Sequence, residues 1–204
     1  GPGSDNVEGG AGFDVYKLTY AYDNYSLNQV SDETWLIDGN PGEGDDLITG
    51  IERLSFGDVT FGDSMIQIVA LDTGPGETAG QAYRLYQAAF ARMPDGQGVS
   101  YHVNDIEKNG LNLYQVAQNF LASPEFLDKY GSNLSDIDYV NALYQNVLGR
   151  SGSETEVKFY IDNFEKEKTE AGYMDRGMAL IGFSESPENI SLVASQIDNG
   201  ILFF

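Results

Sequence analysis

A glycine-rich stretch near the start of the chain most constrains how this sequence can fold. Residues 9–17 read Gly-Gly-Ala-Gly-Phe-Asp-Val-Tyr-Lys. Glycine adopts backbone conformations that other residues avoid, so the stretch predicts a tight turn whose carbonyl oxygens can face a cation. The Asp14 carboxylate adds a hard anionic oxygen, which is the kind of ligand that Ca²⁺ prefers. The large apolar residue Tyr16 should begin a short strand and point into the core.

The same pattern recurs nearby. Residues 41–49 repeat it with Pro in place of the first Gly, and residues 5–8 fit the end of an earlier copy. The pattern resembles the nonapeptide of the repeats-in-toxin (RTX) family of exported proteins, whose repeats coil into a calcium-bound β-roll. Residues 50–58 resemble the segment that closes such a roll. The alternative is a glycine-rich turn between strands, which needs no metal.

The RTX resemblance implies a calcium site in this part of the chain. Its side-chain ligands would be Asp5, Asp14 and Asp46. Its backbone ligands would be the carbonyl oxygens of Gly10, Gly12, Gly42 and Gly44.

Acidic residues dominate the composition. The 204 residues include 32 Asp and Glu against 11 Lys and Arg, a net charge of −21. Such a chain should bind neither nucleic acid nor anionic membranes, because both demand a positive surface. Its self-repulsion destabilises the compact state, and calcium that binds only the folded form would offset this. The alternative is an acidic surface that serves solubility alone.

The sequence carries no recognisable catalytic machinery. It has no Cys, which excludes disulfides, thiolate metal sites and a cysteine nucleophile. Its single histidine, His102, cannot by itself form the usual zinc sites. G-x-S-x-G, H-E-x-x-H and P-loop motifs are all missing. No apolar run approaches the ~20 residues of a membrane-spanning helix. We therefore expect no catalytic residues, no enzymatic activity and no membrane insertion.

The periodicity predicts an α+β fold with two parts. Residues 5–72 read as a short β-roll or β-sheet element, residues 73–77 as a linker, and residues 78–204 as an all-α domain. Helices are expected from about 78 to 92, from Asp95 onward, around 113–121, and after Ser123, which should cap the helix begun by Pro124.

The helical part is internally repeated. Leu85–Arg92 match Leu143–Arg150, and Phe120–Glu125 match Phe183–Glu188. The matches predict two repeated four-helix units. This half resembles, over about 77–195, a tandem helical domain of unknown function found in surface and S-layer-like proteins, with the first copy the better match. It is distantly similar to the helical linker domains of phycobilisomes. Arg92 and Arg150 end equivalent helices, where each either holds the structure together or binds an anion, and the first interpretation is favoured.

Aromatic residues suggest a possible ligand face. Tyrosine stacks on sugar rings and hydrogen-bonds to hydroxyl groups. The residues concerned are Tyr16, Tyr20, Tyr22, Tyr25 and Trp35. Packing between strands is the competing explanation.

The two ends carry further signals. Gly1–Ser4 resemble the remnant of a cleaved tag. Asp198–Phe204 resemble the C-terminal signal that type I secretion machinery recognises, or else form a last strand or helix end that docks on the core.

These observations together predict a secreted, calcium-binding, non-enzymatic module. It would attach to or recognise polysaccharide or another component at the bacterial cell surface. One alternative is an accessory C-terminal module of a secreted polysaccharide-active enzyme or protease. Another is a self-assembling surface-layer component.

Overall fold

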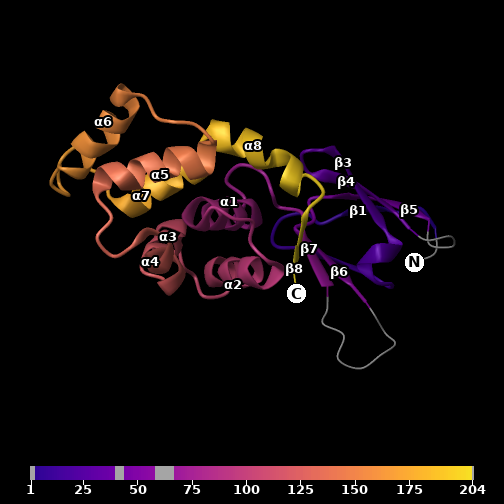
Figure 1. Cartoon of the computed structure of the whole chain (residues 1–204). Helices are drawn as coiled ribbons and strands as arrows, with labels where there is room; N and C mark the ends of the chain where they lie inside the picture. The colour runs from indigo at the N-terminus through magenta and orange to yellow at the C-terminus, as the bar shows by residue number, and fades with distance from the viewer. Residues whose placement is uncertain (1–2, 40–43, 58–66, 204) are drawn as a thin grey trace. The chain divides into compact units, whose positions relative to one another are not determined.

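The chain forms two compact units, each with a hydrophobic core of its own. We describe it from a computed structural model, over residues 3–39, 44–57 and 67–203 (Figure 1). The first unit, called the β unit here, comprises residues 1–80, 95–100 and 195–204. The second, the helical unit, comprises residues 81–94 and 101–194.

The β unit contains two four-stranded sheets. The first has the strand order β1-β5-β4-β3, and the second has the order β2-β6-β7-β8. The strands are β1 (Asn6–Glu8), β2 (Val15–Leu18), β3 (Ser26–Ser31), β4 (Thr34–Asp38), β5 (Asp45–Thr49), β6 (Arg53–Phe56), β7 (Gln67–Ala70) and β8 (Ile201–Phe203).

Two parallel strand pairs define how the chain winds through these sheets. β1 pairs with β5 in one sheet, with Val7 opposite Ile48. β2 pairs with β6 in the other, with Tyr16 opposite Leu54. The chain thus passes from the first sheet to the second, returns through the antiparallel β3–β4 hairpin, and makes the same passage again. The result is a mixed sheet region without a closed barrel.

A single core joins the two sheets. Alternate residues of a strand point to the same face of a sheet. Trp35 and Ile37 of β4 are buried in this way, as are Leu54 and Phe56 of β6. They pack in one cluster with Ile48 of β5. The pattern predicts that the apolar residue two positions after each Asp points into the core. Ile48 is buried there, whereas Val7 and Tyr16, at the same position of the other copies, are partly buried against it.

Some strands begin or end at other residues than the sequence predicts, because a strand ends where its partner strand ends. Partial alternation over residues 13–22 predicts an extended segment, but β2 pairs with β6 only as far as Leu18, and a short 3₁₀ helix (Tyr22–Asn24) follows. β3 was not predicted, because Leu27 is its one buried residue. Short strands are also predicted at 60–61, which lie outside the described residues, and at 65–69, whose described part from residue 67 belongs to β7.

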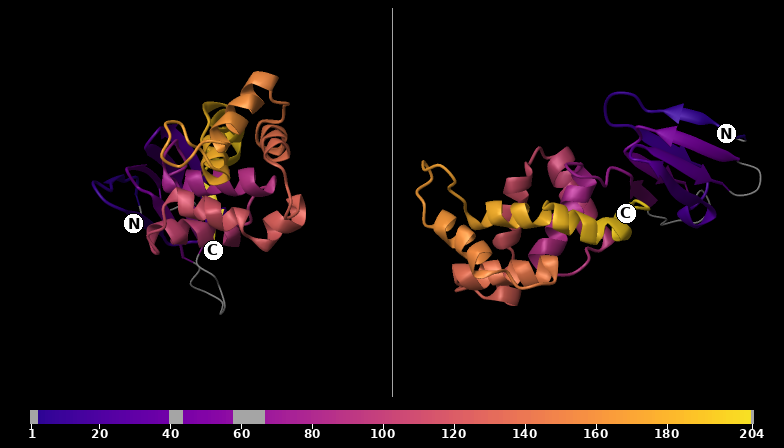
Figure 2. Two further views of the ribbon diagram at one scale, coloured as in Figure 1. Left: turned by 90° about the vertical axis from the view of Figure 1, so that its left-hand side faces the viewer. Right: turned by 90° about the horizontal axis from the view of Figure 1, so that it is seen from above.

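The described residues form eight α-helices (Figure 2). Ser123 caps the helix that Pro124 begins, accepting a hydrogen bond from the Phe126 N–H at 3.2 Å, and this confirms the prediction for that helix start. The helices are α1 (Thr78–Phe90), α2 (Gly96–Glu107), α3 (Leu113–Leu121), α4 (Pro124–Tyr130), α5 (Asp136–Leu148), α6 (Glu154–Phe164), α7 (Arg176–Ser184) and α8 (Pro187–Ile197).

An aromatic and aliphatic core holds the helical unit together. Phe120 of α3 and Phe183 of α7 are buried, and each meets a tyrosine ring edge-on, Tyr86 and Tyr144 respectively. A buried ion pair joins distant parts of the chain, because the Arg84 Nη2 lies 2.7 Å from the Glu185 Oε2. Removal of one partner from such a pair leaves an uncompensated buried charge.

The segment expected to be a linker is held to the β unit. The Asp72 carboxylate pairs with Arg53 and accepts a hydrogen bond from the Ala79 N–H at 3.2 Å. The Gly74 N–H donates to the Glu77 carboxylate at 2.6 Å. At the other end of the chain, β8 pairs antiparallel with β7, so Ile201–Phe203 form a strand of the second sheet.

Candidate functional site

Asp14 occupies an unusual position among the residues proposed to bind calcium. Its N–H donates to the Glu52 carboxylate at 2.7 Å, and its carbonyl oxygen accepts from the Glu52 and Arg53 N–H groups, both at 3.2 Å. Its side-chain oxygen Oδ2 is buried and has no hydrogen-bond partner. A buried anionic oxygen without a partner is costly. This atom has the character expected of a cation ligand.

The glycines beside Asp14 allow close backbone approach. A Cβ atom on Gly9 would lie 2.0 Å from the Gly50 carbonyl oxygen and 3.0 Å from the Asp14 Oδ2. Residue 9 therefore has to be glycine for a steric reason, with or without a metal. Gly10, Gly12 and Gly44 all have positive φ angles. Gly42 lies outside the described residues.

Asp46 is held by protein donors. Its side chain is buried, and its Oδ1 accepts from the Asp5 N–H at 3.0 Å. Its Oδ2 accepts from the Tyr16 hydroxyl at 2.8 Å. The Asp5 carbonyl oxygen accepts in turn from the Leu47 N–H at 2.8 Å. Asp46 thus ties β5 to the start of β1 and to β2.

The carboxylates do not form a cluster. Within residues 3–39, 44–57 and 67–203, no three His, Cys, Asp or Glu side chains are grouped so that they could hold a metal ion. Asp5, Asp14 and Asp46 therefore do not converge on one point. A cation at Asp14 would draw its other ligands from backbone carbonyl oxygens, which glycine-rich turns present well.

An acidic pocket of about 150 Å³ lies in the β unit and shares Gly10 and Glu52 with the surroundings of Asp14. Burial raises the pKa of Glu77, with further contributions from the negative charges of Asp72, Glu33 and Glu52. Burial also raises the pKa of Asp72, opposed by the neighbouring Arg53. The pocket could not be predicted from the sequence, because its acidic residues are far apart along the chain. The lining residues are Gly10, Asp32, Glu33, Trp35, Gly50, Ile51, Glu52, Leu71, Asp72 and Glu77.

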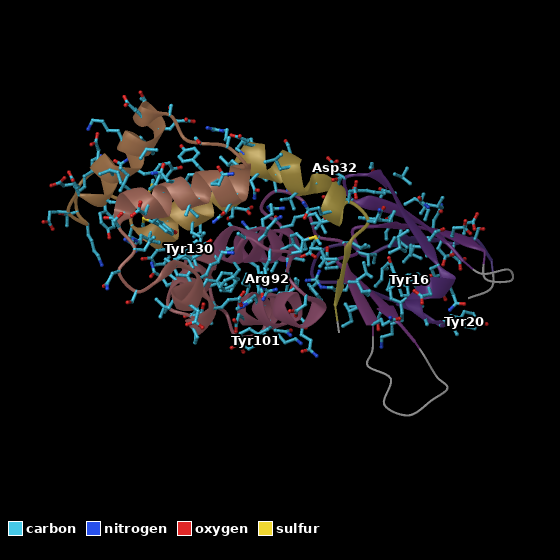
Figure 3. All side chains as sticks on the ribbon, viewed as in Figure 1. Tyr16, Tyr20, Asp32, Arg92, Tyr101 and Tyr130 are labelled. Atoms are coloured by element: carbon cyan, nitrogen blue, oxygen red, sulfur yellow. The ribbon has the colours of Figure 1, made fainter. Side chains whose placement is uncertain are left out.

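The tyrosines of the proposed ligand face mainly pack within the β unit. Tyr22 and Tyr25 lie against Phe56, with ring centroids 5.3 and 5.6 Å apart. The Tyr25 hydroxyl accepts from the Tyr20 N–H at 3.2 Å, and Tyr20 itself is 46% exposed. Figure 3 shows Tyr16 and Tyr20 away from Asp32 of the acidic pocket.

Trp35 does not fit the proposed ligand face. Only 2% of its surface is exposed, because β4 turns it into the core shared by the two sheets. It offers no open ring face on which a sugar could stack.

Arg92 and Arg150 make closely similar contacts in the helical unit. The Arg92 Nε lies 2.8 Å from Glu125 Oε1, with its guanidinium 4.8 Å from the Tyr86 ring centroid. The Arg150 Nε lies 2.8 Å from Glu188 Oε1, and its guanidinium carbon lies 5.1 Å from the Tyr144 ring centroid. Both cations are thus paired with carboxylates of this chain, which agrees with the structural interpretation of these residues.

Arg150 makes one further pair. It donates hydrogen bonds to Glu156 and lowers the pKa of that carboxyl to about 2. The Ser153 N–H donates to the same carboxylate at 2.7 Å, as part of a capping box at the start of α6.

His102 packs among aromatic rings. Its ring centroid lies 4.3 Å from that of Phe120, and its Nδ1 is 3.2 Å from the Asp105 Oδ2. Burial lowers the pKa of His102, partly offset by the negative charge of Asp105. A neutral histidine in this setting is a packing residue.

A second open feature lies between α5 and α6. We call it the α5–α6 groove, and its volume is about 570 Å³. Ile137, Val157 and Ile161 supply its apolar surface. Charged residues lie around them, among them Glu154, Lys158, Asp162 and Glu165. No sequence signal indicated this groove, because the same residues read as ordinary amphipathic helices.

Comparison with known families identifies part of the helical region. Residues 117–193 match a family model described as a domain of unknown function, DUF4214. The match runs from within α3 into α8 and so takes in the second predicted copy, whereas the sequence comparison favoured the first. A search of the curated proteins found no match. No helix among the described residues is long and apolar enough to cross a membrane.

Proposed function

We propose that this chain is a calcium-stabilised, non-enzymatic attachment or recognition module of an exported RTX-type bacterial protein. It would work outside the cell, on polysaccharide or another cell-surface component, after export by type I secretion through its C-terminal segment. Asp14 would hold the calcium with backbone carbonyl oxygens of the adjoining glycine turns. The ion would neutralise negative charge where the β unit winds between its sheets.

The buried, unpartnered Oδ2 of Asp14 is the observation that carries this proposal. The winding of the strands supports it. Val7 and Ile48 occupy the same position of the repeated pattern and are paired partners in β1 and β5. Successive strands, β1 then β2 and β5 then β6, fall in opposite sheets. A roll built from short repeats would place its strands in this way.

The helices support a tandem repeat as the second part of the module. α1 spans Thr78–Phe90 and α5 spans Asp136–Leu148, so the two helices have the same length. They are separated by the same number of residues as the matched segments Leu85–Arg92 and Leu143–Arg150. The Arg92–Tyr86–Glu125 contacts recur as Arg150–Tyr144–Glu188. We infer two copies of one four-helix unit, α1 to α4 and α5 to α8.

The charge suggests why such a module would be less stable before export than after it. At the low calcium concentration of the cytosol, a chain of net charge −21 repels itself. Millimolar calcium outside the cell would bind the folded form and shift the equilibrium toward it. With a Kd of about 0.1 mM, each site contributes roughly 1.4 kcal/mol at 1 mM calcium.

Calcium titration of matched variants tests the proposal. The midpoint of thermal unfolding, followed by circular dichroism, should rise in 1 mM CaCl₂ relative to chelator, and MgCl₂ should have a smaller effect. Asp14→Asn should abolish the calcium-specific rise. Asp23→Asn removes the same charge from an exposed site of the β unit and should keep it. A midpoint of thermal unfolding that does not change with calcium, or an equal change with calcium in the two variants, would contradict a site at Asp14.

A glycan-array screen in millimolar calcium tests the attachment part of the proposal. Binding to an extracellular polysaccharide that is lost with chelator is the expected result. Binding that persists in chelator would separate recognition from the calcium-dependent fold.

A further inference from the structure

The α5–α6 groove leaves apolar side chains uncovered. Ile137 of α5 lines the groove and is 53% exposed. Val157 and Ile161 of α6 are half-buried beside it. Exposed apolar side chains that gather in a groove of about 570 Å³ are the usual mark of a binding surface.

The corresponding surface of α1 and α2 gives a direct comparison. At the spacing of the proposed repeat, Ile137, Val157 and Ile161 correspond to Ala79, Val99 and Val103. Those three residues are 0%, 1% and 2% exposed. Each of these residues is therefore buried in the first copy, whereas its counterpart in the second copy lines an open groove. Side chains at these positions can be covered by packing, and in the second copy no described residue covers them completely.

The charges around the groove indicate what kind of partner fits. Three of its charged residues are acidic, namely Glu154, Asp162 and Glu165. The one basic residue, Lys158, is already paired with Asp162. The groove therefore combines an apolar floor with a net negative rim, which complements apolar and basic side chains together.

We propose that the α5–α6 groove binds an amphipathic, positively charged helix of a partner protein. Such a helix would lay its apolar face on Ile137, Val157 and Ile161 and direct Lys or Arg side chains toward the acidic rim. A second copy of this chain is a poor occupant, since it carries the same net charge of −21. This inference rests on the proposed helical repeat, but it does not depend on calcium or on polysaccharide binding.

A synthetic peptide provides the test. The probe is an 18-residue amphipathic helix of Leu and Lys with a fluorescent label, and its control has the same composition in a scrambled order. Anisotropy is measured with the full chain at 150 mM NaCl. We expect the amphipathic peptide to bind more tightly than the scrambled one. Ile137→Arg should weaken that binding about tenfold or more, since it removes an apolar contact and adds a like charge.

Leu192→Arg is the matched control. Leu192 of α8 is 52% exposed, close to the 53% of Ile137, and does not line the groove. This variant adds the same charge and should change binding less than about twofold. Equal weakening by both variants, or equal binding of both peptides, would overturn the proposal in favour of general attraction to an acidic surface.

Two further measurements separate the remaining outcomes. Hydrogen exchange with bound peptide should slow in α5 and α6, and protection confined to other helices would contradict the assignment. Sedimentation of the protein alone tests self-association, and a dimer lost in Ile137→Arg would identify a second copy as the occupant and overturn the proposed one. Calcium chelation should leave peptide binding unchanged. A failure of the peptide-binding proposal can therefore be told apart from a failure of the proposed calcium-dependent function.

Discussion

At the scale of single residues, His102 illustrates how burial sets a protonation equilibrium. Its side chain is 14% exposed and lies against Phe120 and Tyr86. Burial disfavours the charged ring, so the pKa of His102 in the folded state lies below the ordinary value of 6.5. The Asp105 carboxylate opposes this shift without reversing it.

This environment predicts an acid-sensitive contribution to stability. Well above pH 6.5 the ring is neutral in both the folded and the unfolded chain, and its contribution is constant. As the pH falls below that value, the unfolded chain takes up the proton first, and the free energy of unfolding decreases. His102→Phe keeps an aromatic ring there and should flatten this part of the pH profile. Urea unfolding of both proteins between pH 7 and 5 measures the difference, and parallel profiles would contradict it.

The sequence identified individual residues well where the signal was local. Ser123 and Pro124 predict a helix start from two adjacent residues alone, and in the structure Ser123 caps α4. Trp35 was assigned to a surface because aromatic type says nothing about which face of a strand a residue occupies. That choice depends on the register of β4 against β5, which sequence alone does not fix.

At the scale of secondary-structure elements, the turn before β2 depends on one close backbone contact. Gly9 donates its N–H to the Thr49 carbonyl oxygen at 3.0 Å and faces the Gly50 carbonyl oxygen. Because a backbone oxygen cannot move aside as a flexible side chain can, there is no room for a methyl group at this position.

Gly9→Ala should therefore destabilise the β unit by about 2 kcal/mol or more, since overpacking forces backbone shifts. Gly182→Ala is the comparison. A Cβ at Gly182 of α7 would meet nothing within 4 Å, so alanine there should be neutral or stabilising by up to about 1 kcal/mol. Denaturant unfolding of the two variants measures both effects. A Gly9→Ala protein as stable as wild type would show that the contact with Gly50 is readily relaxed.

Helices were easier to predict than strands for a physical reason. A helix is stabilised by residues three and four positions apart, and the spacing around 113–121 was sufficient to place α3. A strand needs a partner that can be distant in sequence. β8 is the clearest case, since Ile201–Phe203 pair with β7 more than 130 residues earlier. The repeated pattern recurs at the positions that pair in β1 and β5, but β6, the parallel partner of β2, carries no copy of it.

At the scale of the whole molecule, charge is the dominant imbalance. The chain carries 32 acidic against 11 basic residues, so most acidic side chains have no cation of this chain to pair with. Raising the salt concentration has two opposite effects on such a molecule. It weakens exposed pairs such as Arg92–Glu125, which contribute little in any case. It also screens repulsion among many carboxylates, which act over longer distances.

We expect the screening of carboxylate repulsion to be larger than the weakening of exposed ion pairs, so salt should stabilise this protein. Between about 10 and 150 mM NaCl the screening length falls from roughly 30 to 8 Å. We expect the midpoint of thermal unfolding to rise by about 2–4 °C, equivalent to about 1 kcal/mol for a chain of this size. Calorimetry in chelator measures this effect without calcium, and adding CaCl₂ at matched ionic strength then isolates the increment assigned to Asp14. A midpoint that falls with NaCl would mean that exposed ion pairs such as Arg92–Glu125 outweigh the net charge.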